Sequence, residues 1–270
     1  MADKNHKIHL HEEKETLLIT LYAKALDNRL KHPILHDQKA EEILGMIDYD
    51  FEKLKDFGNE IMVARAKQFD VWLQKFLKTN PNATVLNLGC GLDTRISRIH
   101  PPSTVRWFDI DYPEVIEIRK KFFSNQPGYE MVPSSVTDPG WLENIPDNNP
   151  VMIIAEGMLE YLTETEVKTL LNRLTDHFSN GQIAFDVMNT FAVHAGKKNL
   201  HETTGAEHKW AVDHIGDSDK LNPDMKRMAN VSVMGTKYIR KLPLKSRLLF
   251  RFMYFIPNFR NMMRLLLYKF

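Results

Sequence analysis

Residues 85–96 read VLNLGCGLDTRI, an apolar run that stops at Gly89-Cys90-Gly91 and restarts as a predicted helix. A Gly-x-Gly turn after a buried strand lets the backbone approach a ligand closely, and the next helix offers free N–H groups. The dinucleotide fingerprint requires a third glycine around a pyrophosphate, but that position is Thr94 here. The turn therefore weakens, without excluding, a dinucleotide site, and a lone Gly-x-Gly is also common as a plain turn without a ligand.

Short apolar segments alternate with predicted helices on both sides of this turn. Helices are predicted from Pro113, a favoured first helical residue, and from Thr163, which stands in capping-box spacing with Glu166. Alternating strands and helices predict right-handed crossovers and a parallel sheet covered on both faces, so the fold class is α/β. The predicted strands, rich in β-branched and aromatic residues, lie at 83–88, 104–110, 129–133, 151–156 and 182–188.

The remaining segments suggest two additions to this sheet. Residues 12 to about 79 have helical periodicity, in an amphipathic stretch at 15–30 and a stripe of large apolar residues in 59–80. Residues 190–235 are polar, loop-like and rich in histidine, and they follow the fifth strand. Because ligands of such sheets bind beyond the carboxyl ends of the strands, this insertion predicts a lid. We expect a helical cap at 1–80 and a main domain at 81–270, with a lid-like insertion at about 190–235.

Acidic residues follow two of the predicted strands. Asp109 and Asp111 stand about 20 residues beyond Gly89, and a carboxylate there can accept hydrogen bonds from both hydroxyls of a ribose. Asp111 is favoured because it lies at the exit of the strand, although it could merely cap the next helix. Glu156 follows the apolar run VMIIA and is predicted to lie in the ligand cleft.

Arg65 lies on the apolar stripe of the helix predicted at 59–79, where a charge needs a partner. A guanidinium matches a carboxylate in a bidentate manner, so the partner is either a ligand carboxylate or an acidic side chain of the helical region. S-adenosylmethionine fits these groups better than a dinucleotide. It has ribose hydroxyls for Asp111, a carboxylate for Arg65, a cationic end for Glu156 and no pyrophosphate.

The quoted segments resemble the leucine carboxyl methyltransferase family, and more closely its bacterial branch of small-molecule and polyketide O-methyltransferases. The resemblance runs from about residue 15 to the end of the chain. It rests on ETLLITLYAKALDNR, the arginine of ARAKQFD, LNLGCGLDTR, FDIDYPEVIEIRKK and AEGMLEYLTETEVKTLL.

This resemblance implies a Rossmann-like class I methyltransferase fold. Its sheet has seven strands, mostly parallel with one antiparallel strand, and helices on both faces, under an N-terminal helical cap. We expect residues 263–270 to be the antiparallel strand.

Carried over by position, the family's cofactor residues fall on the site already described, with S-adenosylmethionine as cofactor and S-adenosylhomocysteine as product. Arg65 would bind the methionine carboxylate and Glu156 would line the methionine end. The family usually has Asp-Leu near the adenine, whereas this chain has Ser135-Val136, so either Ser135 or Asp138 would make that contact. The implied cofactor residues are Arg65, Gly89, Gly91, Asp111, Ser135 and Glu156.

The predicted reaction is O-methylation of a small-molecule carboxylate or hydroxyl, with a polyketide-like acceptor among the options. An ionised carboxylate needs no general base, whereas a hydroxyl usually needs one. No residue is identified as that base, because the histidines of the insertion are expected to be solvated: His194, His201, His208 and His214. Two alternatives stay open, an NAD-dependent oxidoreductase and a non-catalytic S-adenosylmethionine-binding regulatory protein. No metal site is predicted, since Asp186 and Asn189 alone do not make a magnesium site.

Composition and charge limit the cellular location and the partners expected for the protein. The net charge is +1, the single Cys90 allows no intrachain disulfide, and no signal peptide or apolar run of about 20 residues is present. We expect a cytoplasmic protein that binds no nucleic acid. The chain after Asp224 holds eleven Lys and Arg and no acid. It could contact an anionic membrane surface, but because it also resembles the family's own C-terminal region, a membrane role is not expected. The sequence does not predict the oligomeric state.

Overall fold

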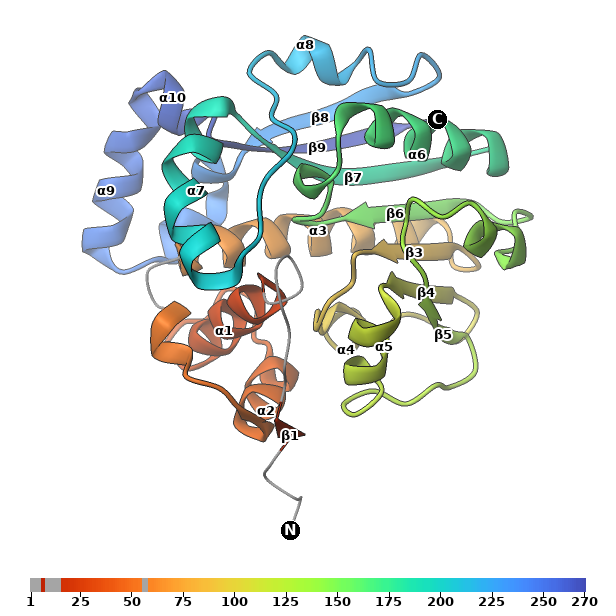
Figure 1. Ribbon diagram of the computed structural model, residues 1–270, viewed down its shortest axis with the longest axis horizontal. Helices are drawn as coiled ribbons and strands as arrows, with labels where there is room; N and C mark the ends of the chain where they lie inside the picture. Colours follow the sequence, from red (N-terminus) through yellow and green to blue (C-terminus); the bar gives the residue numbers. More distant parts are fainter. Residues whose placement is uncertain (1–5, 8–15, 55–57) are drawn as a thin grey trace.

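A computed structural model describes residues 6–7, 16–54 and 58–270 of the chain. Its centre is a seven-stranded sheet in the order β5-β4-β3-β6-β7-β9-β8 (Figure 1). β9 pairs antiparallel with both β7 and β8, and the pairings among the other five strands are parallel. The sheet predicted from the sequence is therefore confirmed, including its antiparallel strand at the C-terminus. The strands are β3 (Thr84–Leu88), β4 (Arg106–Asp111), β5 (Tyr129–Pro133), β6 (Val151–Ala155), β7 (Gly181–Met188), β8 (Lys226–Ser232) and β9 (Met263–Lys269).

Successive side chains of the central strands bury themselves in two different apolar layers. On β6, Met152 and Ile154 belong to one core cluster, whereas Val151, Ile153 and Ala155 belong to the other. This alternation follows from the two-residue period of a strand. A strand buried on both faces must be apolar at every position, and all five residues of β6 are buried.

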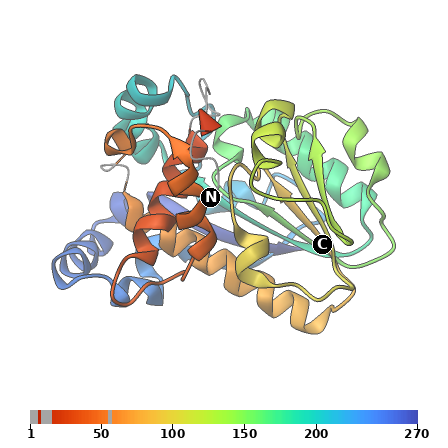
Figure 2. The same cartoon turned by 90° about the horizontal axis from the view of Figure 1, so that it is seen from below.

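Helices cover both faces of the sheet (Figures 1 and 2). The α6 helix packs its buried leucines into the second apolar layer, while α3 contacts β6 from the first layer. Two further helices, α1 and α2, lie outside α3 at the carboxyl ends of the strands. The helices up to α6 are α1 (Thr16–Asn28), α2 (Gln38–Met46), α3 (Asn59–Thr79), α4 (Arg95–Ile99), α5 (Pro113–Arg119) and α6 (Glu164–His177).

The N-terminal helices α1, α2 and α3, referred to below as the cap helices, share their core with the sheet. α1 packs against α2 and α3, and Leu18 of α1 lies in the same apolar cluster as Val85 of β3. A two-residue parallel ladder, β1 (His6–Lys7) with β2 (Ile47–Asp48), lies beyond α2. The described part of residues 1–80 is thus continuous with the main domain in its packing.

The segment 190–235 has more regular structure than its polar sequence predicts. It contains α7 (Thr190–Thr204) and the short α8 (Ile215–Ser218), and it ends in β8, a full strand of the sheet. The prediction of a loop over the whole segment is therefore wrong. β8 has no continuous apolar run in the sequence, because it lies at the sheet edge and three of its residues are exposed.

The C-terminal segment continues from β8 through two short 3-10 turns, η5 (Val233–Gly235) and η6 (Lys237–Lys241). The chain then forms α9 (Leu244–Phe255) and α10 (Pro257–Arg260) before β9. No helix among the described residues is both long and apolar enough to span a membrane.

The capping box predicted at the start of α6 is formed on both sides. The Thr163 hydroxyl accepts the Glu166 backbone N–H, and the Glu166 carboxylate accepts the Thr163 N–H at 2.7 Å. Removing the hydroxyl in Thr163→Ala should lower the free energy of unfolding by about 1 kcal/mol. Thr165→Ala is the matched control, because Thr165 lies two residues later in the chain and is also exposed. Equal urea midpoints for the two variants would contradict a stabilising cap.

Candidate functional site

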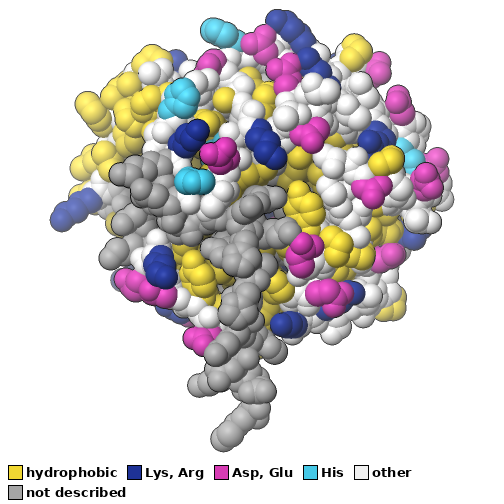
Figure 3. All heavy atoms as spheres, in the orientation of Figure 1, with side chains coloured by type: hydrophobic (Ala, Val, Ile, Leu, Met, Phe, Trp, Pro, Cys, Tyr) yellow, Lys and Arg dark blue, Asp and Glu magenta, His cyan; other side chains and the backbone are white. Residues whose placement is uncertain are grey.

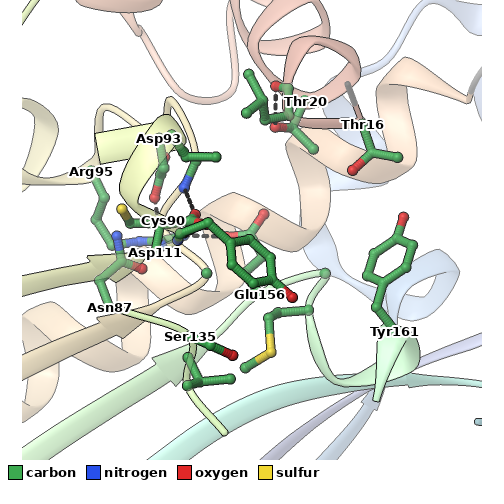
Figure 4. A pocket seen from close by; sticks show the side chains of 18 of the residues that line it. Thr16, Thr20, Asn87, Cys90, Asp93, Arg95, Asp111, Ser135, Glu156 and Tyr161 are labelled. Carbon is green, nitrogen blue, oxygen red and sulfur yellow. Dashed lines mark hydrogen bonds and ion pairs between the residues drawn. The ribbon is translucent and has the colours of Figure 1, made fainter. Parts of the chain in front are cut away.

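A pocket lies at the carboxyl ends of β3, β4 and β6 and is closed from above by α1 (Figure 4). All six cofactor residues predicted from the sequence line it. The other lining side chains come from α1, from β3 and the turn after it, from α4, from the start of α5, from the loop after β5 and from the segment after β6. The lining includes Thr16, Leu17, Thr20, Lys24, Arg65, Asn87, Gly89, Cys90, Gly91, Asp93, Arg95, Asp111, Tyr112, Val115, Ser135, Val136, Glu156, Met158 and Tyr161.

The glycines of the turn after β3 are required by backbone conformation and by space. Gly89 and Gly91 have φ angles of 62° and 49°, in the left-handed region that side chains disfavour. A Cβ at Gly89 would lie 2.5 Å from Cγ of Met158, and one at Gly91 would lie 3.1 Å from Cβ of Leu17. The turn thus places backbone without side chains at the pocket wall, between the segments that contain Met158 and Leu17.

Asp111 ends β4 beside this turn. Its carboxylate accepts the Gly91 N–H at 2.7 Å and the Tyr112 N–H at 2.8 Å. Burial raises its pKa to about 6 despite these two hydrogen bonds. The carboxylate therefore lies in the pocket with accepting capacity beyond the two backbone groups.

Asp109, the alternative to Asp111, lies inside the protein and outside the pocket lining. Its carboxylate accepts from Arg119, from the Tyr129 hydroxyl at 2.7 Å and from the Asn87 amide at 2.9 Å. Arg119 in turn donates to the backbone oxygens of Gly91 and Asp93. Asp109 and Arg119 thus hold the glycine turn from behind, a role that the sequence did not predict.

Arg65 is buried and pairs with two carboxylates of the protein. Its Nε lies 3.1 Å from Glu156 Oε1, and its Nη1 lies 2.9 Å from Asp186 Oδ2. Asp186 also accepts the Gly157 N–H at 2.8 Å. Gly157 has φ +63°, and a Cβ there would come within 2.9 Å of the guanidinium. Arg65 therefore has structural partners, but they come from the sheet, after β6 and in β7, and not from the helical region as the sequence suggested; Arg65 nevertheless lines the pocket.

Arg95 is the centre of a larger buried ion network. Its Nε lies 2.8 Å from Asp70 of α3, its Nη1 lies 2.6 Å from Asp93, and its Nη2 pairs with Glu156. Lys24 of α1 lies 2.6 Å from Asp93. Glu156, predicted to face a cationic ligand end, thus already bonds two arginines.

Arg98 extends this network to α2. It pairs with Asp70 at 2.9 Å and with Asp37 at 2.6 Å. Asp37 is also the N-cap of α2, accepting the Ala40 N–H, and it accepts the Thr94 hydroxyl. The string Asp93-Thr94-Arg95 therefore ties all three cap helices to the end of the sheet.

The charges of the network set the protonation of its acids. Burial disfavours the ionised carboxylates of Asp93 and Glu156, but the neighbouring Arg95 and Lys24 outweigh it and lower both pKa values. Glu160 is different, because burial and the charge of Asp186 raise its pKa to about 8. Its Oε2 has no hydrogen-bond partner among the described residues. Glu160 is thus a neutral acid at pH 7, next to the network.

Ser135 lies in the pocket lining, and its hydroxyl is 2.8 Å from that of Thr137. Asp138, the alternative for the same contact, is exposed and accepts the Gly140 N–H. Of the two, the fold brings only Ser135 to the pocket.

The histidines of segment 190–235 divide into two groups. His194, His201 and His214 are exposed, as expected. His208 is not, because its ring packs against Tyr161 with a centroid distance of 5.1 Å, and Tyr161 lines the pocket. Burial lowers the pKa of His208, and its Nδ1 has no partner among the described residues.

Lys24 and Arg95 are the main pocket residues that the sequence reasoning missed. Lys24 lies seven residues after Leu17 and three after Leu21, on the apolar face of α1. Like Arg65, Lys24 is a charge on a buried helical stripe, and such a charge needs a partner. Arg95 gave no such signal because its five-residue helix is too short to show a face.

Asp186 and Asn189, considered above as magnesium ligands, make other contacts. Asp186 bonds Arg65 and Gly157, while Asn189 caps α7 through the Ala192 N–H. Within residues 6–7, 16–54 and 58–270, no group of three or more metal-ligating acids, histidines or cysteines is found.

A mostly parallel sheet with β9 inserted antiparallel, a glycine turn after β3 and an acid ending β4 together define a Rossmann-like, class I methyltransferase. A family model, leucine carboxyl methyltransferase, matches residues 17–175. The chain belongs to this family.

Two curated relatives match over most of their length. The tetracenomycin polyketide synthesis O-methyltransferase TcmP of Streptomyces glaucescens is 36% identical over 95% of this chain and 96% of its own. The S-adenosyl-L-methionine-dependent methyltransferase dpfgK of Gibberella zeae is 31% identical, covering 84% and 85%. The chain is accordingly an S-adenosylmethionine-dependent methyltransferase, and the oxidoreductase alternative is not supported.

Solved structures agree on the fold. A Thermobifida fusca protein, provisionally assigned as a methyltransferase, has a TM-score of 0.63 at 16% identity, covering 96% of this chain and 95% of its own. The plantazolicin methyltransferase BpumL, in complex with S-adenosylhomocysteine and a substrate analogue, has a TM-score of 0.50 at 14% identity, covering 95% and 98%.

Truncating Arg95 tests the ion network. Arg95→Met would leave three buried carboxylates short of a partner, which should lower the free energy of unfolding by about 3 to 5 kcal/mol. Arg106→Met, at an exposed arginine of β4, should change it by less than about 0.5 kcal/mol. Chemical denaturation measures both, and a small loss for Arg95→Met would show that the network contributes little.

Proposed function

We propose that this chain methylates an oxygen atom of a small molecule, a carboxylate or a hydroxyl, in the space between the cofactor pocket and the loop around His208. The observation that carries this proposal is the position of the pocket: it contains Asp111 and the glycine turn, and α1 and Tyr161 bound its opposite side. The identity with TcmP, an O-methyltransferase, supports oxygen as the acceptor atom.

The residues along the pocket match the chemical groups of S-adenosylmethionine, taken one after another along the cofactor. Asp111 would accept hydrogen bonds from the ribose hydroxyls, Gly89 and Gly91 would let the backbone approach the cofactor, and Ser135 would contact the adenine. The bound cofactor supplies an activated methyl group on a sulfonium. The chain then has to align the acceptor in line with it and exclude water.

At the methionine end, the ion network would bind both charges of the amino acid. Arg65 and Lys24 would face the carboxylate, and Glu156 or Asp93 would face the ammonium group. Arg65 is held by Glu156 and Asp186, so it is oriented before the cofactor arrives. A group fixed in place loses little entropy on binding, which favours affinity.

A hydroxyl acceptor would need a base, and His208 is the candidate. Its neutral ring packs on Tyr161, whose hydroxyl points toward Thr16 across the opening of the pocket (Figure 4). Burial lowers the pKa of His208 from its ordinary value of 6.5, so the imidazole is unprotonated and can accept a proton at neutral pH. A carboxylate acceptor would leave His208 without this role.

Replacing Asp111 separates binding from stability. Because folding raises the pKa of this carboxyl from 3.8 to about 6, the folded chain binds its proton more tightly, and stability falls as pH rises from about 4 to 6. Asp111→Asn removes this titration, so its stability should fall less than that of the parent chain as pH rises from about 4 to 6. The same variant should bind S-adenosylhomocysteine at least about tenfold more weakly.

Titration calorimetry and thermal melts measure both effects, with Asp138→Asn as the control that should change neither. Unchanged affinity in Asp111→Asn would exclude the ribose contact.

A panel of phenols and carboxylic acids identifies the acceptor. If hydroxyls are methylated, His208→Gln should reduce kcat for phenols by about 10² or more and leave carboxylates unaffected. In the parent enzyme the rate with phenols should stay constant at neutral pH and fall only as His208 becomes protonated at lower pH. Exposed His201 provides the control substitution. Binding of the cofactor with no methylation of any panel member would favour the regulatory alternative.

A further inference from the structure

The α9 helix presents an apolar face to solvent. Five of its side chains are between 56% and 73% exposed, and their spacing places four of them along one side of the helix. They are Leu244, Leu248, Leu249, Phe252 and Phe255. Elsewhere among the described residues, only Leu30 and Met228 are large apolar side chains of comparable exposure.

The opposite side of α9 anchors it firmly. Phe250 is buried against the C-terminal 3-10 turns, and the Ser246 hydroxyl donates to Glu60 of α3 at 3.2 Å. The packing of the opposite side therefore fixes the orientation of α9, so its apolar face points to solvent in a well-anchored helix.

Positive charge surrounds this face. Lys245, Arg247 and Arg251 of α9 are exposed and have no ion-pair partner among the described residues, and Arg240 and Lys241 precede the helix. No acidic residue occurs after Asp224, whereas residues 1–224 carry 35 acidic and 25 basic side chains. The charge asymmetry thus coincides with the apolar face.

The face is convex. α9 lies at one extreme end of the molecule in both ribbon views (Figures 1 and 2), and hydrophobic side chains gather along the same edge in the space-filling view (Figure 3). A projecting helix can insert its apolar side chains between lipid headgroups, whereas a partner helix would need a groove to receive it.

We propose that α9 is a membrane-surface helix that binds anionic lipid bilayers. Leucine and phenylalanine side chains would enter the boundary between headgroups and acyl chains, and the flanking lysine and arginine side chains would pair with lipid phosphates. The helix would lie in the plane of the membrane, because its 12 residues are too few to cross one. An acidic helical protein partner is disfavoured, since the apolar side chains form a ridge.

Co-sedimentation of the full chain with vesicles tests this proposal. We expect binding to phosphatidylcholine vesicles that contain phosphatidylglycerol, little binding to phosphatidylcholine alone, and release at high salt. Phe252→Ser combined with Phe255→Ser should weaken binding to the anionic vesicles by about tenfold or more. Arg247→Glu combined with Arg251→Glu should likewise weaken binding to the anionic vesicles at low salt.

Matched controls are Met228→Ser, which removes an exposed apolar side chain on β8, and Lys226→Glu, which reverses an exposed charge there. Both should bind vesicles like the parent chain, and all variants should retain their melting temperature and their affinity for S-adenosylhomocysteine. Three results would overturn the proposal. These are no binding to anionic vesicles, binding unaffected by the phenylalanine substitutions, or a parent oligomer that these substitutions convert to monomer, which would make α9 an interface between copies.

Discussion

The guanidinium of Arg95 is the point on which the arrangement of cap and sheet depends. It joins carboxylates from α3, from the glycine turn and from the end of β6, three segments that are far apart in the sequence. Buried charges are tolerated only when they are paired, so each of these segments has one acceptable position relative to the others. The network therefore fixes where α1 and α3 lie over the carboxyl ends of the strands.

Two separate strings of the sequence meet in this network, residues 89–95 after β3 and residues 156–157 after β6. In the string after β3, Gly89 and Gly91 bring backbone to the pocket, and Asp93 and Arg95 form the ion pairs that connect the cap helices to the sheet. In the string after β6, Glu156 joins Arg65 to Arg95, and Gly157 leaves room for the Arg65 guanidinium. The same interactions that stabilise the fold thus orient charges toward the pocket. This explains why a binding site can be preformed without a ligand.

The two ends of the chain have different electrostatic character. The first 224 residues, which build the pocket, are acidic in balance, whereas the last 46 residues carry only positive charges. Five of those positive charges lie on or just before α9: Arg240, Lys241, Lys245, Arg247 and Arg251. A chain with a net charge close to zero can therefore present a strongly basic face, and net charge alone conceals it.

The sequence by itself determined the five parallel strands and β9, the helices between them, the capping box of α6 and six of the residues that line the pocket. These features depend on local periodicity, on turn chemistry and on where parallel strands end. It did not determine which charges pair, because pairing depends on distances between segments separated by 60 to 120 residues in the chain.

The tertiary structure alone decided several points. It gave Arg65 two protein carboxylates, and it placed His208 of a polar segment against Tyr161, a residue of the pocket lining. It also made α7 and β8 out of residues without a strong pattern, and it left the apolar side of α9 facing outward. Packing decides such matters: a helical stripe predicts that a face is apolar, and only the neighbouring elements determine whether that face is covered.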